Sequence, residues 1–174
     1  MSIELSKGSH RKIFIASVIA FIFLSSLLNE IKAQEDPPRP PSIAQTIDLS
    51  FGAFYQAAGG GTVTVDELGS RSYSGNIVLL TLGGYPFSAA HFNINSNPGT
   101  IINIMNIPDF QLTWSGYSMN VHIEATNPLL PHINSNPYSV PTELTIGATL
   151  SVGDPVANPP GDYSGTFNVT LVIE

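Results

Sequence analysis

From Thr46 to the end of the chain, apolar and polar residues alternate in six stretches. A period of two places alternate side chains on one face of a β-strand, so each stretch predicts a strand. No ten consecutive residues of this region show helical spacing, and the pattern therefore predicts an all-β domain. The apolar positions are Ile47, Leu49 and Phe51; Val63 and Val65; Phe92 and Ile94; Val121, Ile123 and Ala125; Leu144, Ile146, Ala148, Leu150 and Val152; and Phe167, Val169, Leu171 and Ile173.

The stretches between these strands are rich in glycine, asparagine and proline, which supply the dihedral angles of turns. They are "AAGGGT", "GGYP", "NSNPG", "ATNPLLP", "NSNPYSVP" and "GDPVANPPGD". Short strands with one apolar face predict an antiparallel, immunoglobulin-like β-sandwich of about seven to nine strands over residues 46–174. The sequence "INSNP" occurs at 94–98 and again at 133–137, and we interpret the two copies as similar turns.

The last predicted strand is the most regular one. Phe167, Val169, Leu171 and Ile173 face one way, and the polar residues between them face the other. We expect this strand to be an ordered, interior part of a sheet that one chain completes by itself. The alternative is strand exchange between subunits by β-strand addition, with "TIDLSF" as the donated strand. In either case the four apolar residues form the candidate assembly strand.

The N-terminus has the features of a secretory signal peptide over residues 1–33. Basic residues precede an uncharged apolar run of 16 residues, 13–28, and Ala33 provides a small residue for the peptidase. We expect cleavage before Gln34; because a spanning helix needs about 20 residues, an uncleaved anchor is the alternative. Residues 34–45 contain "PPRPP" and predict an extended spacer. These features predict export to the periplasm or the outer cell surface, with no membrane insertion after cleavage.

Charge and cysteine content exclude several classes of partner. Removing residues 1–33 takes away four basic and two acidic residues, which changes the net charge from −7 to −9 and leaves only Arg39 and Arg71 as cations. Because Lys and Arg neutralise phosphates, nucleic acid and anionic membranes are excluded as partners. The sequence contains no cysteine, so an apolar core and not disulfides must stabilise the 141 residues of the mature chain.

Three motifs, "GGGTVTV", "GSRSYSG" and "GDYSGTF", carry a resemblance to a known family that extends over nearly all of residues 46–174. The chain resembles the secreted bacterial family catalogued as domain of unknown function 4402. It is similar, more remotely, to spore coat protein U-like and pilin-like immunoglobulin-type sandwiches of Gram-negative bacteria. The resemblance implies a secreted sandwich and supplies no catalytic residues.

Two groups of residues have the chemistry of metal ligands. His122 and Glu124 lie two residues apart on one strand face, a spacing from which a metal takes two ligands. Asp154, Asn158 and Asp162 carry oxygen atoms that suit calcium, but their spacing matches no EF-hand and prolines separate them. We interpret the first pair as part of a solvated face and the second group as turn-forming residues. We therefore expect no metal and no cofactor.

Motifs for catalysis are missing from the sequence. "AAGGGT" lacks the Lys-Ser/Thr pair of a P-loop and opens a strand, so we interpret it as a flexible turn. There is no G-x-S-x-G and no cysteine, and the serines of "GSRSYSG" have no histidine nearby in sequence. Asp66 and Glu67 are neighbours in a turn, whereas a glycosidase needs two carboxylates across a cleft. We therefore expect a protein without catalytic activity.

Aromatic residues offer one further kind of site. Trp114, Tyr117, Tyr85 and Tyr138 are candidates for an aromatic platform that binds sugars, and Trp114 with Tyr117 is the candidate ligand face. The plainer interpretation is packing in the core or at its rim.

Exclusion and resemblance together favour a secreted cell-surface, coat or fimbria-like structural protein whose partners are other surface subunits. A carbohydrate-binding or adhesive module, with glycans as partners, is the first alternative. An uncharacterised secreted enzyme is the second, and it would require a histidine near a serine or two facing carboxylates.

Overall fold

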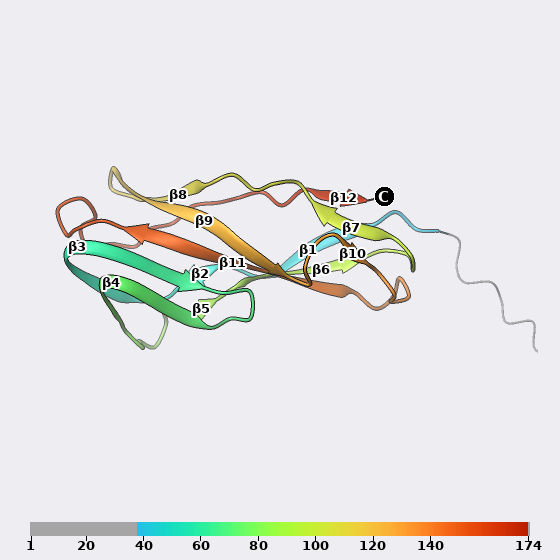
Figure 1. The fold of residues 1–174 in the computed structure, drawn as a ribbon, viewed down its shortest axis with the longest axis horizontal. Helices are drawn as coiled ribbons and strands as arrows, with labels where there is room; N and C mark the ends of the chain where they lie inside the picture. Colours follow the sequence, from blue (N-terminus) through green and yellow to red (C-terminus); the bar gives the residue numbers. More distant parts are fainter. Residues whose placement is uncertain (1–37, 174) are drawn as a thin grey trace, which may run out of the picture. The chain divides into compact units, whose positions relative to one another are not determined.

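The computed structural model of the protein describes residues 38–173. The predicted signal peptide, its cleavage site before Gln34 and the first residues of the predicted spacer lie outside this range. The described residues form twelve strands and no helix (Figure 1). The strands are β1 (Ser42–Ile47), β2 (Ser50–Phe51), β3 (Phe54–Val65), β4 (Arg71–Leu79), β5 (Phe87–Ser88), β6 (Ala90–Asn95), β7 (Ile101–Ile104), β8 (Phe110–Trp114), β9 (Tyr117–Asn127), β10 (His132–Ile133), β11 (Thr142–Val152) and β12 (Leu171–Ile173).

The predicted all-β antiparallel sandwich is confirmed. One sheet contains seven strands, β1, β3, β4, β6, β8, β9 and β11, and these are the strands of five or more residues. β7, β10 and β12 form a second sheet, and β2 pairs with β5 in a third. No helix that could span a membrane occurs in the part of the chain that the structure describes.

β11 is the central strand of the large sheet. Residues 142–146 pair with β6 and residues 148–152 pair with β3 along one edge of β11, while residues 145–151 pair with β9 along the other. The change of partner occurs at Gly147, where a Cβ atom would lie 2.5 Å from the backbone nitrogen of Glu67. The β3–β4 turn therefore packs directly on the backbone of β11, and only glycine leaves room for it.

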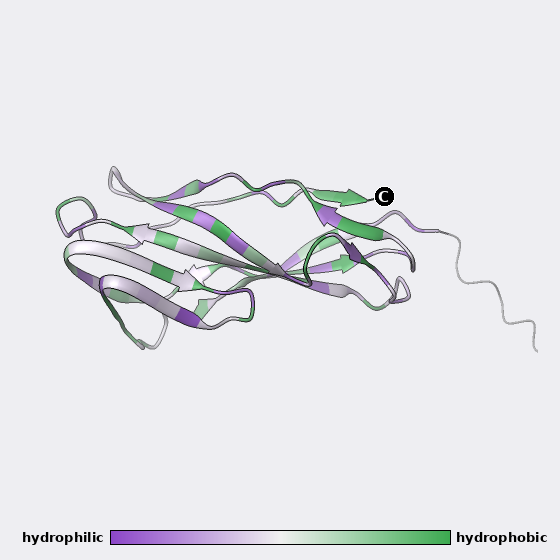
Figure 2. Ribbon diagram, in the orientation of Figure 1, coloured by the Kyte–Doolittle hydropathy of each residue, from purple (hydrophilic) through white to green (hydrophobic). Residues whose placement is uncertain are grey.

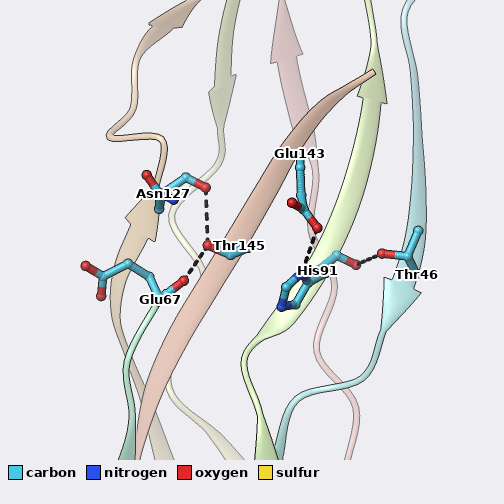
Figure 3. A network of polar contacts seen from close by, with 6 residues as sticks. All are labelled: Thr46, Glu67, His91, Asn127, Glu143 and Thr145. Carbon is cyan, nitrogen blue, oxygen red and sulfur yellow. Dashed lines mark hydrogen bonds and ion pairs between the residues drawn. The ribbon is translucent and has the colours of Figure 1, made fainter. Parts of the chain in front are cut away.

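Polar groups hold this junction together (Figure 3). Thr145 is buried, although alternation places it on the polar face of β11. Its hydroxyl donates to the carbonyl oxygen of Glu67 at 2.6 Å and lies 3.3 Å from that of Asn127. On the same face, Nδ1 of His91 lies 2.8 Å from Oε1 of Glu143. Thr145 thus joins β11 to the β3–β4 turn and to the end of β9.

The apolar faces of the strands form two clusters of buried side chains, and Leu49 and Ile123 pack against both. Figure 2 shows the alternation of apolar and polar residues along β9 and β11. The apolar positions predicted for β6 and β11 are all buried, which confirms the period-two interpretation there. The first cluster includes Val63, Val65, Met119, Val121, Ala148, Leu150 and Val152, and the second includes Phe92, Ile94, Ile102, Leu144 and Ile146.

The N-terminal part of the domain differs from the prediction. β1 starts at Ser42, inside the predicted spacer 34–45, and "TIDLSF" is divided between β1 and β2. The pairing of β1 with β6 shifts register between Gln45 and Ile47, and Ile47 is 43% exposed whereas Phe51 is buried. A bulge of this kind changes which face a side chain occupies, and the alternation of residues alone does not show it.

The prediction that "AAGGGT" forms a turn is wrong, because these residues lie within β3. The register of β3 against β4 shifts between Gln56 and Gly61, and Gly59 and Gly60 have positive φ angles of 94° and 63°. The glycines therefore form an irregularity inside one long strand. Glycine-rich composition is common to bulges and turns, and only the pairing with β4 distinguishes them here.

The C-terminal segment forms less regular strand than predicted. Only β12 is a strand, and it pairs with β7 at the edge of the sheet β10–β7–β12. The apolar side chains of the segment pack against the second core cluster, and the polar ones between them are exposed. The packed residues are Phe167, Val169, Leu171 and Ile173. The segment is therefore ordered, but the expected position in the interior of a sheet is wrong.

The two "INSNP" copies contact each other. Asn134 in the second copy is buried, and its Nδ2 atom donates to the carbonyl oxygen of Ser96 at 2.8 Å in the first copy. The backbone N–H of Asn134 donates to the carbonyl oxygen of Thr100 at 2.9 Å, just beyond that copy. Asn134 of the second copy thus fixes, by hydrogen bonds at Ser96 and Thr100, the connection between β6 and β7.

Candidate functional site

An open groove of about 840 Å³ is the first candidate site. Residues 48–56 line one wall and residues 159–167 line the other. Apolar side chains of the large sheet complete the lining, and its volume falls within the roughly 300–1,000 Å³ of ligand-binding clefts. These side chains are Phe92, Phe110, Leu112, Met119 and Leu150.

The C-terminal wall contains backbone groups that have no hydrogen-bond partner among residues 38–173. Thr113 and Ser164 exchange two backbone hydrogen bonds, and the N–H of Met105 donates to the carbonyl oxygen of Thr170 at 2.9 Å. Between these two anchors, the backbone of residues 165–169 makes no hydrogen bond to another group of residues 38–173. In Figure 1 this segment (red) runs along β8 and ends in β12 beside β7.

The direction of these backbone groups follows from the geometry of an extended chain, in which successive residues point their N–H and C=O groups to opposite edges. Ser164 directs its N–H and C=O groups toward Thr113 of β8, and Thr170 directs its C=O group toward Met105, just after β7. Gly165, Phe167 and Val169 are an odd number of residues from Ser164, so their groups point to the opposite, unpaired edge. The groove adjoins this segment from Ser164 to Phe167.

Arg71 fixes the opposite wall. Its Nη1 atom donates to the carbonyl oxygen of Phe51 at 3.0 Å and its Nη2 atom to that of Leu80 at 2.8 Å, while the guanidinium carbon lies 4.5 Å from the centre of the Phe87 ring. Burial lowers the pKa of Arg71, but a guanidinium remains charged at neutral pH. One of the two arginines of the described domain therefore stabilises a loop and is not available to a ligand.

The groove is acidic at its margin. Asp48 and Asp162 line it, and among the described residues no lysine or arginine does. Residues 38–173 contain eight carboxylates and two arginines in total. The surrounding field therefore favours neutral or cationic ligands.

A cluster of three aromatic rings at the tip of the β8–β9 hairpin is the second candidate site. Trp114 and Tyr117 are direct cross-strand neighbours, 36% and 41% exposed, with ring centroids 6.5 Å apart and planes 22° apart. Tyr163 approaches Trp114 from the C-terminal segment at 6.0 Å and 47°. Trp114 is thus not a core residue, and its contacts with Tyr117 and Tyr163 are compatible with the rim position that the sequence-based interpretation also allowed.

Comparison with known families confirms the resemblance seen in the sequence. A family model described as "Domain of unknown function (DUF4402)" matches residues 42–172. The protein belongs to the DUF4402 family. No curated protein and no solved structure matches the chain. The more remote similarity of this DUF4402 protein to spore coat protein U-like sandwiches is not confirmed.

In this DUF4402 protein, His122 pairs with Asp109 and not with Glu124. Nδ1 of His122 lies 2.7 Å from Oδ1 of Asp109, and Asn120 donates to the other carboxylate oxygen at 3.2 Å. The hydrogen bond to Asp109 raises the pKa of His122, and the same bond lowers the pKa of Asp109. His122, Asp109 and Asn120 are exposed, and so is Glu124. The expected solvated face is therefore confirmed, and the His122–Asp109 pair is part of it.

Asn158 and Asp154 organise their loop from within. Oδ1 of Asp154 accepts from the N–H groups of Val156 at 3.0 Å and Ala157 at 2.8 Å. Oδ1 of the buried Asn158 accepts from the N–H of Gly153 at 2.6 Å, and its Nδ2 donates to a carbonyl oxygen of β9. The interpretation as turn-forming residues is confirmed for these two. No group of three or more potential metal ligands occurs within residues 38–173.

The remaining candidates lie apart from one another. Asp66 caps the β3–β4 turn, where its Oδ1 atom accepts from the N–H groups of Leu68 and Ser70, as expected of a turn residue. Tyr138 donates to the carbonyl oxygen of Pro40 at 2.9 Å, and Tyr85 lines the groove. The four predicted aromatic residues therefore do not form one platform.

Sequence reasoning missed Asp109 and Tyr163, which tertiary structure brings to His122 and Trp114. The pairing of Trp114 with Tyr117 had a signal in the sequence. "TWSGYS" has the Ser-Gly pair of a two-residue hairpin turn, and Ser115 and Gly116 have φ angles of 48° and 90°. Such a turn places the flanking residues opposite each other.

Proposed function

We propose that this DUF4402 protein is a secreted cell-surface structural protein that assembles with other surface subunits by β-strand addition at the groove. One observation carries the proposal: the groove adjoins an extended segment whose backbone, over residues 165–169, has hydrogen-bonding groups without partners in the described chain. An added strand would pair with this edge, and apolar side chains at alternate positions would enter the groove.

The physical basis is the cost of unpaired backbone groups. An N–H or C=O group beside an apolar surface is poorly hydrated, and pairing it with another strand recovers a net 0.5–1.5 kcal/mol, roughly, per hydrogen bond. Phe110 and Phe167, whose rings stack at 5.0 Å, and Leu112 provide apolar surface along the same wall. A strand bound here would therefore gain both backbone bonds and buried area.

The charge of the domain indicates which kind of strand would bind at the groove. Asp48 and Asp162 lie at the groove, and the described domain has eight carboxylates against two arginines. A second copy of this chain brings the same excess of negative charge, which opposes self-assembly at low ionic strength. The expected occupant is a segment of a different subunit, with alternating apolar residues and with lysine or arginine at its ends.

The donated strand is not expected to be β1. In the structure β1 pairs with β6 of the same chain, from Ser42 to Ile47, and Ile43 packs against the second core cluster. Residues 37–41 are "PPRPP", and proline lacks the N–H that a paired strand donates.

A synthetic peptide tests the proposal directly. We expect a peptide of alternating valine and threonine with lysine at both ends to bind saturably, as measured by fluorescence anisotropy. Hydrogen exchange should slow at the amides of Phe167 and Val169. The amide of Ser164, which donates to Thr113 at 3.1 Å, should be protected with or without peptide and provides an internal control.

A peptide with proline at alternate positions is the matched control, because it keeps the composition similar and loses the N–H donors. Equal binding of both peptides, or exchange at Phe167 and Val169 that the bound peptide does not change, would show that strand addition does not occur. Accessibility of the protein to antibody on intact cells separately tests the surface location.

A further inference from the structure

We propose that Trp114 and Tyr117, together with Tyr163, form a binding surface for neutral saccharides whose pyranose rings present an apolar face. The surface adjoins the groove, because Asp162 and Tyr163 line it, but Trp114 and Tyr117 do not. The proposal depends on three features of the cluster: the exposure of two nearly parallel rings, their rigid placement, and the charge around them.

Both rings of the hairpin are partly exposed. Trp114 and Tyr117 keep 36% and 41% of their surface accessible, so part of each ring is open to a ligand. Their planes differ by only 22° in a stacked arrangement, so the exposed parts of the two rings are available side by side to one ligand. The axial C–H bonds of a pyranose carry partial positive charge, which matches the negative face of an aromatic ring.

The rings are fixed before any ligand binds. Trp114 and Tyr117 end the paired ladder of β8 and β9, which sets their spacing. Gly161 lies against the Trp114 ring so closely that a Cβ atom at position 161 would overlap the ring. Tyr163 contacts Trp114 from the same loop, and its hydroxyl donates to the carbonyl oxygen of Pro159 at 3.0 Å. A preformed surface loses little side-chain entropy on binding.

The charge around the cluster narrows the ligand class. Asp162 lies between Gly161 and Tyr163, is exposed, and can accept hydrogen bonds from sugar hydroxyls. The domain has eight carboxylates against two arginines, so it opposes uronic and sialic acids. β-Linked glucosyl and N-acetylglucosaminyl units fit best, because their equatorial hydroxyls leave axial C–H bonds on both faces of the ring.

The chain provides its own reporter, because Trp114 is the only tryptophan of the sequence. We expect β-1,4-linked hexamers of glucose or N-acetylglucosamine to change the tryptophan fluorescence saturably, and hyaluronan, an anionic polymer, to have no effect. Tyr117→Ala should weaken binding by about tenfold, while Tyr117→Phe, which keeps the ring, should stay within about threefold of the wild type. Tyr73→Ala on β4 removes another exposed tyrosine, 57% accessible against 41% for Tyr117, and should change nothing.

Two results would overturn the proposal. One is unchanged fluorescence with both hexamers up to about 10 mM, well above the 1 mM of weak complexes. The other is a loss of binding with Tyr73→Ala as large as that with Tyr117→Ala. Saturation-transfer NMR on the wild type provides a second measurement that needs no variant, and it should label the axial protons of the pyranose ring most strongly. Peptide binding at the groove is measured separately, so failure of one proposal leaves the other testable.

Discussion

Thr113 and Ser164 exchange both of their backbone hydrogen bonds, at 2.8 Å and 3.1 Å, although they are far apart in sequence. This pair attaches the C-terminal segment to β8 immediately before the unpaired stretch 165–169. Gly165 follows at once, and a Cβ atom there would overlap the carbonyl oxygen of Gln111. The segment is therefore held closely against β8 at one end and by β12 at the other, and its middle relies on side-chain packing.

The first prediction concerns that packing. Phe167 is half-buried and its ring stacks on Phe110 at 5.0 Å and 26°. We expect Phe167→Ala to lower the free energy of unfolding by about 2 kcal/mol, less than the 3–5 kcal/mol of a fully buried phenylalanine. Urea denaturation measures it. Asn168→Ala, an exposed neighbour, is the control and should stay within about 0.5 kcal/mol of the wild type; equal effects of both variants would refute packing as the cause.

The second prediction concerns the junction of the large sheet. In Gly147→Ala the added Cβ atom would lie 2.5 Å from the Glu67 nitrogen and close to the backbone of Asp66. Because backbone and not a flexible side chain must move, we expect a loss of about 3 kcal/mol in unfolding free energy. Gly83→Ala is the matched control, since a Cβ there meets nothing within 4 Å. A thermal or urea midpoint equal to that of Gly83→Ala would contradict the proposed close approach.

The large sheet shows which features of the fold could be predicted from the sequence. Alternation predicted β6, β9 and β11 because one face of each strand packs against the two core clusters, and burial of every second residue then follows from the period of two. The alternation did not reveal that β11 changes its pairing partner from β6 to β3 at Gly147, or that Thr145 is buried on the polar face. Both depend on a turn at residues 66–67, far away in sequence, that packs onto β11.

The candidate sites show the same limit. The hairpin signal "SG" was sufficient to place Trp114 opposite Tyr117, since a two-residue turn fixes the register. Tyr163 joins them only through the path of the C-terminal segment. The unpaired backbone of residues 165–169 also had no signal, because the alternation of Phe167 and Val169 with polar residues is the same in a paired strand and an unpaired one.

The third prediction concerns the pair formed by His122 and Asp109. The hydrogen bond to Asp109 raises the pKa of His122 above its ordinary 6.5, and the bond from His122 lowers that of Asp109 below 3.8. The histidine therefore contributes stability that is fully present below pH 6.5 and is lost as the pH rises through its folded pKa. The aspartate contributes stability that is present above pH 3.8 and is lost as the pH falls through its folded pKa.

The pair should accordingly stabilise the fold most between about pH 4 and 6.5. NMR titration of His122 should give a midpoint above 6.5 in the wild type and a lower one in Asp109→Asn. Glu124→Gln should lower the midpoint less, because Glu124 acts on His122 only through its charge and is the smallest contributor. A midpoint that Asp109→Asn leaves unchanged would exclude the hydrogen bond as the cause.

The fourth prediction concerns the expected signal peptide. Mass spectrometry of protein purified from the producing cells should find a mature chain that starts at Gln34, with or without cyclisation of the glutamine. Recovery of intact peptides covering residues 13–28 from the purified protein would instead support an uncleaved anchor.

The last prediction defines where the folded domain begins. Residues 38–41 are held by exposed contacts: Asn97 bonds the backbone of Arg39 in both directions, at 3.2 Å and 2.8 Å, and Tyr138 donates to Pro40. Because exposed hydrogen bonds contribute little, a chain that begins at Ser42 should lose only about 1 kcal/mol and remain folded. A chain that begins at Asp48 lacks β1, so it uncovers the edge of β6 and removes Ile43 from the second core cluster. We expect it to lose at least about 3 kcal/mol or to unfold, as measured by circular dichroism and urea denaturation. Equal stability of the two truncated chains would show that β1 is dispensable, and the edge of β6, in addition to the groove, would then be free to accept a strand from another subunit.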